Sequence, residues 1–326
     1  MNFKEGRWNH EINVTDFVKT NITPYEGDAS FLAGPTERTK AVWNKCLEAL
    51  AEERANNGVR SLDPSTVSTI TSFAAGYIDK DNEVIVGLQT DEVLRRAIKP
   101  FGGIKVVEKA CRENGVEVDP KVKDIFTHYR KTHNDGVFDA YTEEIRSFRS
   151  LGFLTGLPDN YARGRIIGDY RRLALYGIDR LIEAKQDDLR HLTGPMTDER
   201  IRLREEVAEQ IKALKEIKVM GQQYGLDLSR PATTAQEAVQ WVYMAYLAAV
   251  KEQDGAAMSL GNVSSFLDIY IEYDMAHGNL DELHAQELID QFVIKLRMVR
   301  HLRMQAYTDI FAGDPTWVTE SIGGRF

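Results

Sequence analysis

Residues 234–250 constrain the fold most strongly, because they form a helix-length segment without a continuous polar face. The segment begins with Thr234 and Glu237, which have the spacing of a capping box. From Ala238 to Val250 the side chains are apolar or aromatic on nearly every side of the predicted helix. A helix that is hydrophobic all round is stable in water only when other elements cover it. We therefore predict that this helix is deeply buried.

Length and composition are sufficient for such a core. The chain has 326 residues, of which 43% are hydrophobic, and it contains no internal repeat, low-complexity tract or flexible linker. We therefore predict one domain over residues 1–326. The formal net charge of -9 disfavours a sequence-independent grip on nucleic-acid phosphates, so we expect no nucleic-acid partner.

Nothing in the sequence indicates secretion or a membrane. The longest apolar run, 241–250, is far shorter than the roughly 20 residues that cross a bilayer, and the N-terminus resembles no signal peptide. We therefore expect a cytoplasmic protein without a membrane partner. Two cysteines, Cys46 and Cys111, cannot build a disulfide framework or a zinc site of several thiolates. We expect both to be reduced thiols in the core.

Metal and nucleotide sites are also disfavoured. His128 and His133 are five residues apart, so a helix would point them away from each other. His277 and His284 would lie nearer one helix face, but no pattern of carboxylates accompanies them. The segment GPTERTK at 34–40 lacks the second glycine and the hydroxyl of a phosphate-binding loop. We expect no metal and no nucleotide bound at these positions.

The apolar spacing predicts a mostly helical chain. Thr36 is expected to cap a helix that ends near Gly58, with Trp43, Leu47 and Leu50 on its buried face. Further helices are predicted over residues 88–99, 104–114, 120–133, 197–220 and 281–303. The β-branched segments 66–72 and 84–90 are candidate strands.

The first candidate site lies within residues 152–180. Gly156 and Pro158 predict a turn, and a helix is expected to begin near Tyr161. In the sequence Arg163-Gly164-Arg165, two guanidinium groups flank a residue without a side chain. Such planar forks at a helix N-terminus match a carboxylate, which predicts a seat for a small organic acid. Pairing with surface Asp and Glu explains the same pattern, and residue types alone do not decide between them.

Several long segments, taken together, resemble one enzyme family. They include TPYEGDASFLAGPTERT, STITSFAAGYID, RAIKPFGGIK, IFTHYRKTHNDGVFDAYT, TGLPDNYARGRIIGDYRRLALYGID and GDPTWVTESIGG. In this order they resemble the N-terminal part of the pyruvate formate-lyases, or formate acetyltransferases, which are glycyl radical enzymes. The resemblance covers essentially the whole chain. It implies an α/β fold, the N-terminal portion of a ten-stranded α/β barrel, with this segment predominantly helical and the C-terminal half of the barrel absent.

The resemblance also implies an activity. Members of the family convert pyruvate and coenzyme A into acetyl-coenzyme A and formate, by a glycyl radical that passes to a cysteine thiyl, in anaerobic glucose fermentation. It implies no permanently bound cofactor, coenzyme A as co-substrate, a homodimer, and a radical S-adenosylmethionine enzyme that installs the radical. By the same resemblance Arg165 matches the ligand of the pyruvate carboxylate. Trp317 matches an indole beside the reactive cysteines, and Phe138 matches an aromatic near the coenzyme A adenine.

The chain departs from the family where the chemistry occurs. The family's cysteine pair, its second pyruvate-binding arginine and its radical glycine have no match in residues 1–326, and Cys46 and Cys111 lie outside the cysteine motif. We therefore expect this chain to be inactive by itself. The ending Arg325-Phe326 matches a pair found slightly later in the family. This leaves open whether a loop is missing before Arg325. A relative acting on 2-ketobutyrate and a non-catalytic truncated fragment remain as alternatives.

Overall fold

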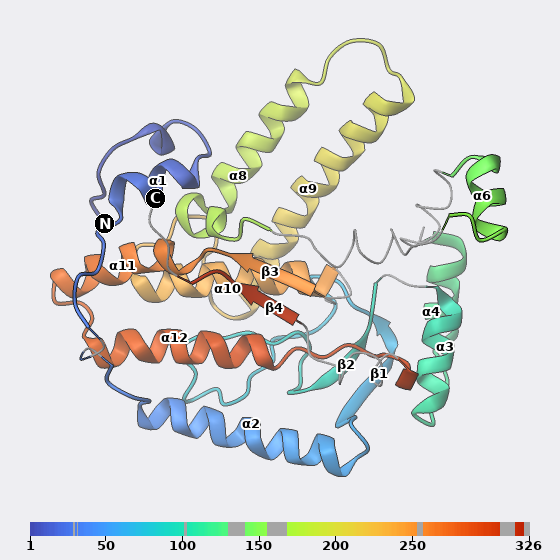
Figure 1. The fold of residues 1–326 in the computed structure, drawn as a ribbon, viewed down its shortest axis with the longest axis horizontal. Helices are drawn as coiled ribbons and strands as arrows, with labels where there is room; N and C mark the ends of the chain where they lie inside the picture. The colour runs from blue at the N-terminus through green and yellow to red at the C-terminus, as the bar shows by residue number, and fades with distance from the viewer. Residues whose placement is uncertain are drawn as a thin grey trace.

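The structure is a computed structural model that describes residues 1–28, 30, 32–100, 103–129, 141–154, 168–252, 257–306 and 317–322. Helices make up most of it, and the strands are short (Figure 1). The longer helices are α1 Val14–Asn21, α2 Glu37–Ala55, α3 Ile104–Glu113, α6 Glu143–Ser150, α8 Arg171–His191, α9 Asp198–Gln223, α10 Ala235–Glu252, α11 Ser264–Ala276 and α12 Glu282–Arg297. A short helix, α4 Pro120–Asp124, continues as one π-helical turn over Ile125–Tyr129.

Helix α10 is the centre of the largest core cluster, as its all-round apolar sequence predicts. Helices α8, α9, α11 and α12 contact it, and Trp241, Tyr243 and Tyr246 are each at most 2% exposed. The deep burial predicted for this helix is therefore confirmed. The capping box is only half formed, because the Glu237 backbone N–H donates to the Thr234 hydroxyl at 3.1 Å, whereas the Glu237 carboxylate accepts from the backbone of Thr233 at 2.8 Å.

Glu237 also ties the start of α10 to the preceding loop. Arg230 donates to both of its carboxylate oxygens, at 2.7 and 2.5 Å. These hydrogen bonds, with those from Thr233, lower the pKa of Glu237 to about 2. The carboxylate is therefore stabilised in its charged form.

We expect replacement of Glu237 by glutamine to lower the free energy of unfolding by about 1–2 kcal/mol at pH 7, after discounting for solvent screening of this partly exposed pair. A lowered pKa stabilises the fold above the unfolded value of 4.5, and this contribution is lost as the pH falls from there towards 2. Urea unfolding at pH 7 and pH 3 measures both effects. Equal differences between wild type and variant at the two pH values would contradict the prediction.

The strands form two separate parallel pairs in the part of the chain that the structure describes. Strand β1, Ser61–Val67, pairs with β2, Arg95–Ile98. Strand β3, Ala257–Gly261, pairs with β4, Trp317–Glu320. A single parallel bridge from Ala97 to His301 extends the first pair. The connection between β1 and β2 contains no helix, whereas the one between β3 and β4 includes α11 and α12, as is typical of parallel strands in an α/β fold.

Two strand predictions need correction. Residues 84–90 are no strand, because side chains of buried glutamines take the place of a neighbouring strand. Val86 donates to Gln240 at 2.7 Å and accepts from it at 2.9 Å, and Val84 donates to Gln291 at 2.7 Å. In the other candidate segment, 66–72, only Thr66 and Val67 belong to a strand.

Strand β2 lies where the sequence predicted a helix over 88–99. Its residues, RRAI, have no strong strand preference, and pairing with β1 on one side and His301 on the other determines their conformation. Arg96 within it is 5% exposed and lies 3.4 Å from the Glu53 carboxylate. Tertiary contacts therefore override the local preference.

Helix α2 is capped by Thr36 as predicted, and Leu50 packs against the core, but the predicted buried face is wrong for Trp43 and Leu47. Its buried face carries Val42, Cys46 and Ala49, whereas Trp43 is 38% and Leu47 is 47% exposed. The buried face also includes a charged residue, Glu53, which binds Arg300, three residues beyond the end of α12, at 3.0 Å. The spacing of apolar residues could not predict which face of α2 is buried, because a buried ion pair forms part of the interface.

Helix α8 begins at Arg171, ten residues after the predicted start near Tyr161, and residues 161–167 lie outside the described part. Gly177 interrupts the helix with φ +70° and ψ 163°. The cause is a loop that inserts beside it. Ile178 donates to the Leu228 carbonyl at 2.9 Å and Asp179 to the Ser229 carbonyl at 3.1 Å. A left-handed φ at this point requires glycine.

The first residues of the chain pack against α11. The Phe3 ring lies 5.0 Å from that of Tyr270 and 5.5 Å from that of Tyr273, both on α11. The backbone of Asn2 donates to the Tyr273 hydroxyl at 3.0 Å.

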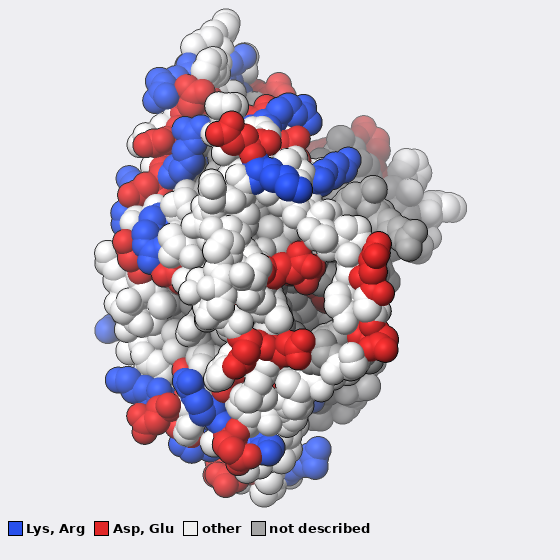
Figure 2. Space-filling model, turned by 90° about the vertical axis from the view of Figure 1, so that its left-hand side faces the viewer, with Lys and Arg blue, Asp and Glu red and all other residues white. Residues whose placement is uncertain are grey.

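On the face shown in Figure 2, Lys and Arg interleave with Asp and Glu towards the upper and lower ends, and uncharged residues cover much of the middle. In the middle right of this face the charged side chains in view are Asp and Glu, so the two signs interleave only towards its margins.

Candidate functional site

The residues just after the Arg165 segment meet the C-terminal end of β3. Arg171, the first residue of α8, binds Asp169 at 2.7 Å and donates to the Asn262 carbonyl at 3.1 Å. Asn262 directly follows β3. This contact fixes residues 169–171 against the β3–β4 pair.

Glu320, at the end of β4, joins the same junction. Its carboxylate accepts from the backbone of Val263 at 3.0 Å and Ser264 at 3.3 Å, at the start of α11. Burial raises the pKa of Glu320, although these two N–H groups and the charge of Arg171 oppose the shift. The junction therefore locks β4, α11 and the start of α8 together.

Trp317 is the first residue of strand β4. In the β3–β4 register Ala257 lies opposite Trp317, and Met258 lies opposite Val318. Trp317 thus lies at the N-terminal end of the pair, whereas Arg171 contacts its C-terminal end. A strand of five residues spans about 13 Å between those ends. The side chain of Trp317 lies outside the described residues, so its role as a pocket wall stays a prediction.

The other two predicted site residues are not placed. Arg165 and Phe138 both lie outside the described residues. The roles of Arg165 as carboxylate ligand and of Phe138 beside coenzyme A therefore stay predictions.

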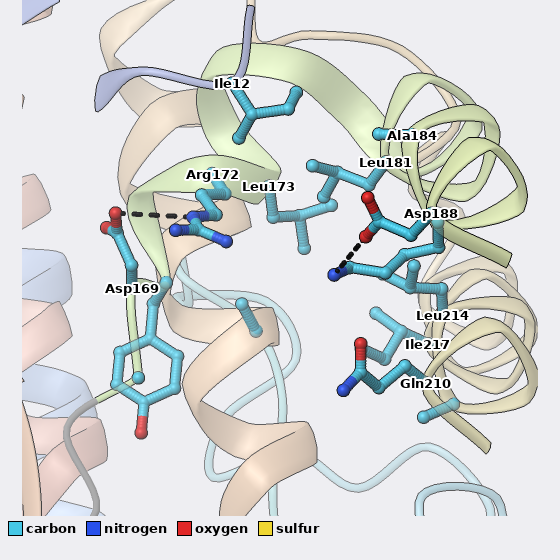
Figure 3. A pocket seen from close by; sticks show the side chains of 15 residues that line it. Ile12, Asp169, Arg172, Leu173, Leu181, Ala184, Asp188, Gln210, Leu214 and Ile217 are labelled. Atoms are coloured by element: carbon cyan, nitrogen blue, oxygen red, sulfur yellow. Dashed lines mark hydrogen bonds and ion pairs between the residues drawn. The ribbon is translucent and has the colours of Figure 1, made fainter. Parts of the chain in front are cut away.

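A cavity of about 620 Å³ lies between α8 and α9, close to this junction (Figure 3). Its lining is mainly aliphatic, with Leu181 on one helix and Leu214 and Ile217 on the other. Two of the charged groups in the lining are paired with each other, Lys185 with Asp188 at 2.9 Å. No cysteine, serine or histidine lines the cavity among the described residues. The cavity can hold an apolar group, and the charges of Lys185 and Asp188 in its lining neutralise each other.

The cysteines are buried thiols, as predicted. Cys46 and Cys111 are free and 0% exposed. Burial raises the pKa of Cys46 to about 12, and burial also raises that of Cys111. A thiol reacts as its thiolate, so neither residue is a nucleophile near neutral pH.

Within the described residues, no group of three or more His, Cys, Asp and Glu side chains could hold a metal ion. No helix in that part of the chain is both long and apolar enough to cross a bilayer. Of the histidine pairs weighed above, His277 binds the Tyr273 carbonyl and His284 binds Asp281, at 2.7 and 2.6 Å. Each of these two rings is engaged locally.

Sequence reasoning missed two buried lysines, Lys251 and Lys295, which are 2% and 1% exposed. Lys295 could have been found, because it lies three residues beyond the apolar Phe292 in the helix predicted over residues 281–303, and residues at that spacing share a helix face. Lys251 ends the all-round apolar helix and carried no such signal. The contact of Arg171 with Asn262 joins residues 91 apart, which no local pattern indicates.

Comparison with known proteins finds a family and a curated relative that agree with each other. Residues 7–326 match the family described as pyruvate formate lyase-like. The formate acetyltransferase of Haemophilus influenzae is 56% identical over 327 residues, which cover 99% of this chain and 42% of that protein. The chain therefore spans about two fifths of the length of this curated relative.

Solved structures share the fold at low sequence identity. The B12-independent glycerol dehydratase of Clostridium butyricum aligns with a TM-score of 0.63 and 18% identity, over 91% of this chain and 44% of that one. A Roseburia inulinivorans structure concerned with 1,2-propanediol dehydration aligns with a TM-score of 0.65 and 17% identity, over the same shares. The predicted fold class, a partial α/β barrel of the glycyl radical enzymes, is therefore confirmed. The chain belongs to the pyruvate formate lyase-like family.

Proposed function

We propose that the protein containing this chain is a formate acetyltransferase, which converts pyruvate and coenzyme A into acetyl-coenzyme A and formate. The observation that carries the proposal is the 56% identity, over 99% of this chain, to a relative named formate acetyltransferase. The low-identity structures support the fold alone. The proposal includes coenzyme A as co-substrate, a separate activating enzyme, a homodimer and a cytoplasmic location.

In this proposal the chain supplies substrate positioning. Arg165 would hold the pyruvate carboxylate, and the network of Arg171, Asn262 and Glu320 would fix the end of its segment against β3 and β4. A glycyl radical and the thiyl that it generates would supply one-electron cleavage of the bond between carboxylate and carbonyl carbon. The residues that carry those radicals match nothing in residues 1–326. This part of the protein would hold the substrate in a fixed position and exclude water from it.

The direct test uses the longest polypeptide that the gene encodes, activated by a radical S-adenosylmethionine enzyme. We expect formate release from pyruvate that depends on coenzyme A. Competition between pyruvate and 2-ketobutyrate separates the two substrate preferences, because one methylene changes the transition-state energy by only about 1–3 kcal/mol. We expect residues 1–326 alone to release no formate. Turnover by that fragment would contradict the assignment of the chemistry to residues outside it.

Replacing Arg165 by lysine in the same polypeptide is expected to raise KM for pyruvate about 10- to 100-fold. Lysine keeps the charge but loses the planar fork, and a hydrogen bond between charged groups contributes about 1.5–3 kcal/mol. KM for coenzyme A should stay unchanged. Steady-state formate release at varied pyruvate and coenzyme A measures both constants.

Arg163 provides the matched control, because it flanks the same glycine in the same motif. We expect its replacement by lysine to change KM for pyruvate by less than about twofold, because the resemblance assigns the carboxylate to Arg165 alone. An equal rise in KM for pyruvate in the Arg163 and Arg165 variants would mean that both arginines bind the carboxylate. An unchanged KM for pyruvate in the Arg165 variant would show that Arg165 does not bind the pyruvate carboxylate.

A further inference from the structure

Helix α2 carries a second apolar surface, on the side that faces away from the core. Trp43 and Leu47, about one helical turn apart, are 38% and 47% exposed. The other side of the helix, with Val42, Cys46 and Ala49, is buried, and α12 contacts α2. Helix α2 lies at the lower edge of the molecule in Figure 1. Large exposed apolar side chains that adjoin each other mark surfaces where proteins associate.

Four exposed charged side chains flank these two apolar residues along the same side of α2. All six positions fall within about 140° of the helix circumference, because successive residues are rotated by about 100°. In chain order they are acidic, basic, apolar, apolar, acidic and basic, and together they form the Trp43 face: Glu37, Lys40, Trp43, Leu47, Glu48 and Arg54. Read from the other end of the helix, the series gives the opposite sign at each charged position.

A second copy of α2 in the antiparallel orientation is therefore complementary to the Trp43 face. With the apolar residues of one copy opposite those of the other, Glu37 lies about 1.5 Å along the helix axis from Arg54 of the second copy. Lys40 lies about 3 Å along the axis from Glu48 of the second copy, an offset that a lysine side chain spans. A parallel copy in register would place each charge opposite its own sign. The face thus complements itself about a two-fold axis, as an isologous interface requires.

The contacts that Lys40 makes within its own chain leave it able to change partner. Its ammonium lies 2.7 Å from Glu37, and the two side chains are 52% and 88% exposed. Such an exposed pair contributes little to stability, so exchanging it for contacts between copies costs little. Antiparallel packing also brings the N-terminal end of one helix beside the C-terminal end of the other, and their partial charges attract.

We propose that the Trp43 face is the centre of a two-fold interface between two copies of this protein. The inference rests on the proposed function, which includes a homodimer. Trp43 and Leu47 form the apolar centre of the interface, and the four charged side chains form part of its rim. Complementary charges fix the register and orientation of two partners, so exchanging their signs tests the arrangement directly.

Sedimentation velocity of the full-length protein, over a dilution series from nanomolar to micromolar, measures Kd of the dimer. If the wild type stays dimeric throughout, the rate at which tagged and untagged subunits exchange ranks the same variants. The charge variants are Lys40→Glu, Glu48→Lys and the double variant, and Trp43→Glu tests the apolar centre. Lys212→Glu is the matched control, because Lys212 on α9 forms an exposed pair with Glu209, three residues before it, at 3.4 Å.

We expect Lys40→Glu and Glu48→Lys each to raise Kd about tenfold, because each change occurs twice across the axis and turns two attractions into repulsions. The double variant restores opposite signs at both places, so its Kd should return to within about threefold of the wild type. Trp43→Glu should raise Kd about 100-fold. Lys212→Glu should match the wild type.

Three results would overturn the inference. One is a wild-type protein that is monomeric over the whole series. A second is an unchanged Kd in both single charge variants, even if their thermal midpoints fall, since that assigns the face to another part of the same polypeptide. The third is a double variant that dimerises no better than the single ones. If Trp43→Glu does not fold, the charge variants decide alone.

Formate release by the activated wild type distinguishes failure of the interface from failure of the proposed function. Activity together with an unchanged Kd in the charge variants rejects the interface and keeps the function. Absence of formate release together with the expected changes in Kd rejects the function and keeps the interface.

Discussion

Replacing Lys295 by methionine is expected to lower the free energy of unfolding by about 3–5 kcal/mol, because the substitution leaves Glu83 buried without its counter-charge. The Lys295 ammonium lies 2.8 Å from Glu83, and both side chains are 0% exposed. Glu83 in turn accepts hydrogen bonds from the backbones of Asp79, at 2.8 Å, and Ile78. Burial lowers the pKa of Lys295, and Glu83 opposes that shift. The pair thus joins α12 to the loop that precedes residue 84.

Urea unfolding followed by far-ultraviolet circular dichroism measures this effect. The double variant Glu83→Met with Lys295→Met should recover part of the loss, since it buries no unpaired charge. Lys185→Met is the surface control, because Lys185 pairs with Asp188 in a partly exposed position, and its change should stay below about 1 kcal/mol. A loss at Lys295 no larger than that at Lys185 would show that the buried pair does not hold the fold.

Gly177→Ala is the second substitution with a large expected effect, a loss of about 3–5 kcal/mol. A Cβ at this position would lie 2.4 Å from the Arg230 carbonyl carbon and 2.6 Å from the Ser229 oxygen, both backbone atoms. The combination of φ +70° and ψ 163° is one that essentially only glycine adopts, so an alanine there is strained by about 1–3 kcal/mol. Displacing the loop would also break the hydrogen bonds that Ile178 and Asp179 donate to it, each worth about 0.5–1.5 kcal/mol.

Gly225→Ala separates conformational strain from the clash. Gly225 has φ +74°, close to the +70° of Gly177, but a Cβ there would meet nothing within 4 Å. We expect Gly225→Ala to lower stability by only about 1–2 kcal/mol. Equal losses at Gly177 and Gly225, measured by urea unfolding under one set of conditions, would show that the loop moves aside freely.

The sequence predicted those helices that combine a cap with a regular apolar period. Helices α9 and α12 begin directly after Thr197 and Asp281, whose side chains accept the expected capping hydrogen bonds. The strands could not be predicted in the same way, because they depend on partners elsewhere in the chain. Residues 84–90 have strand composition but bind glutamine side chains, whereas RRAI has weak strand preference but lies between β1 and His301.

In the candidate site, too, local features could be predicted from the sequence, whereas contacts between distant segments could not. The motif around Arg165 is local and could be recognised from residue types, and the family match follows from long segments in one order. The Arg171, Asn262 and Glu320 network joins three distant segments, so only a structure brings it to notice. Lys251 was missed for a different reason, because a lysine at a helix end is ordinarily exposed.

The packing of the first residues on α11 has a consequence for synthesis on the ribosome. The Asn2 backbone and its partner, the Tyr273 hydroxyl, are 271 residues apart in the chain. At about 5–20 residues per second, translation needs about 15–50 s to deliver that partner. During this interval Phe3 and Phe17 have no α11 to cover them. The nascent chain therefore exposes an aromatic surface on which a chaperone can act, and this part of the core closes late.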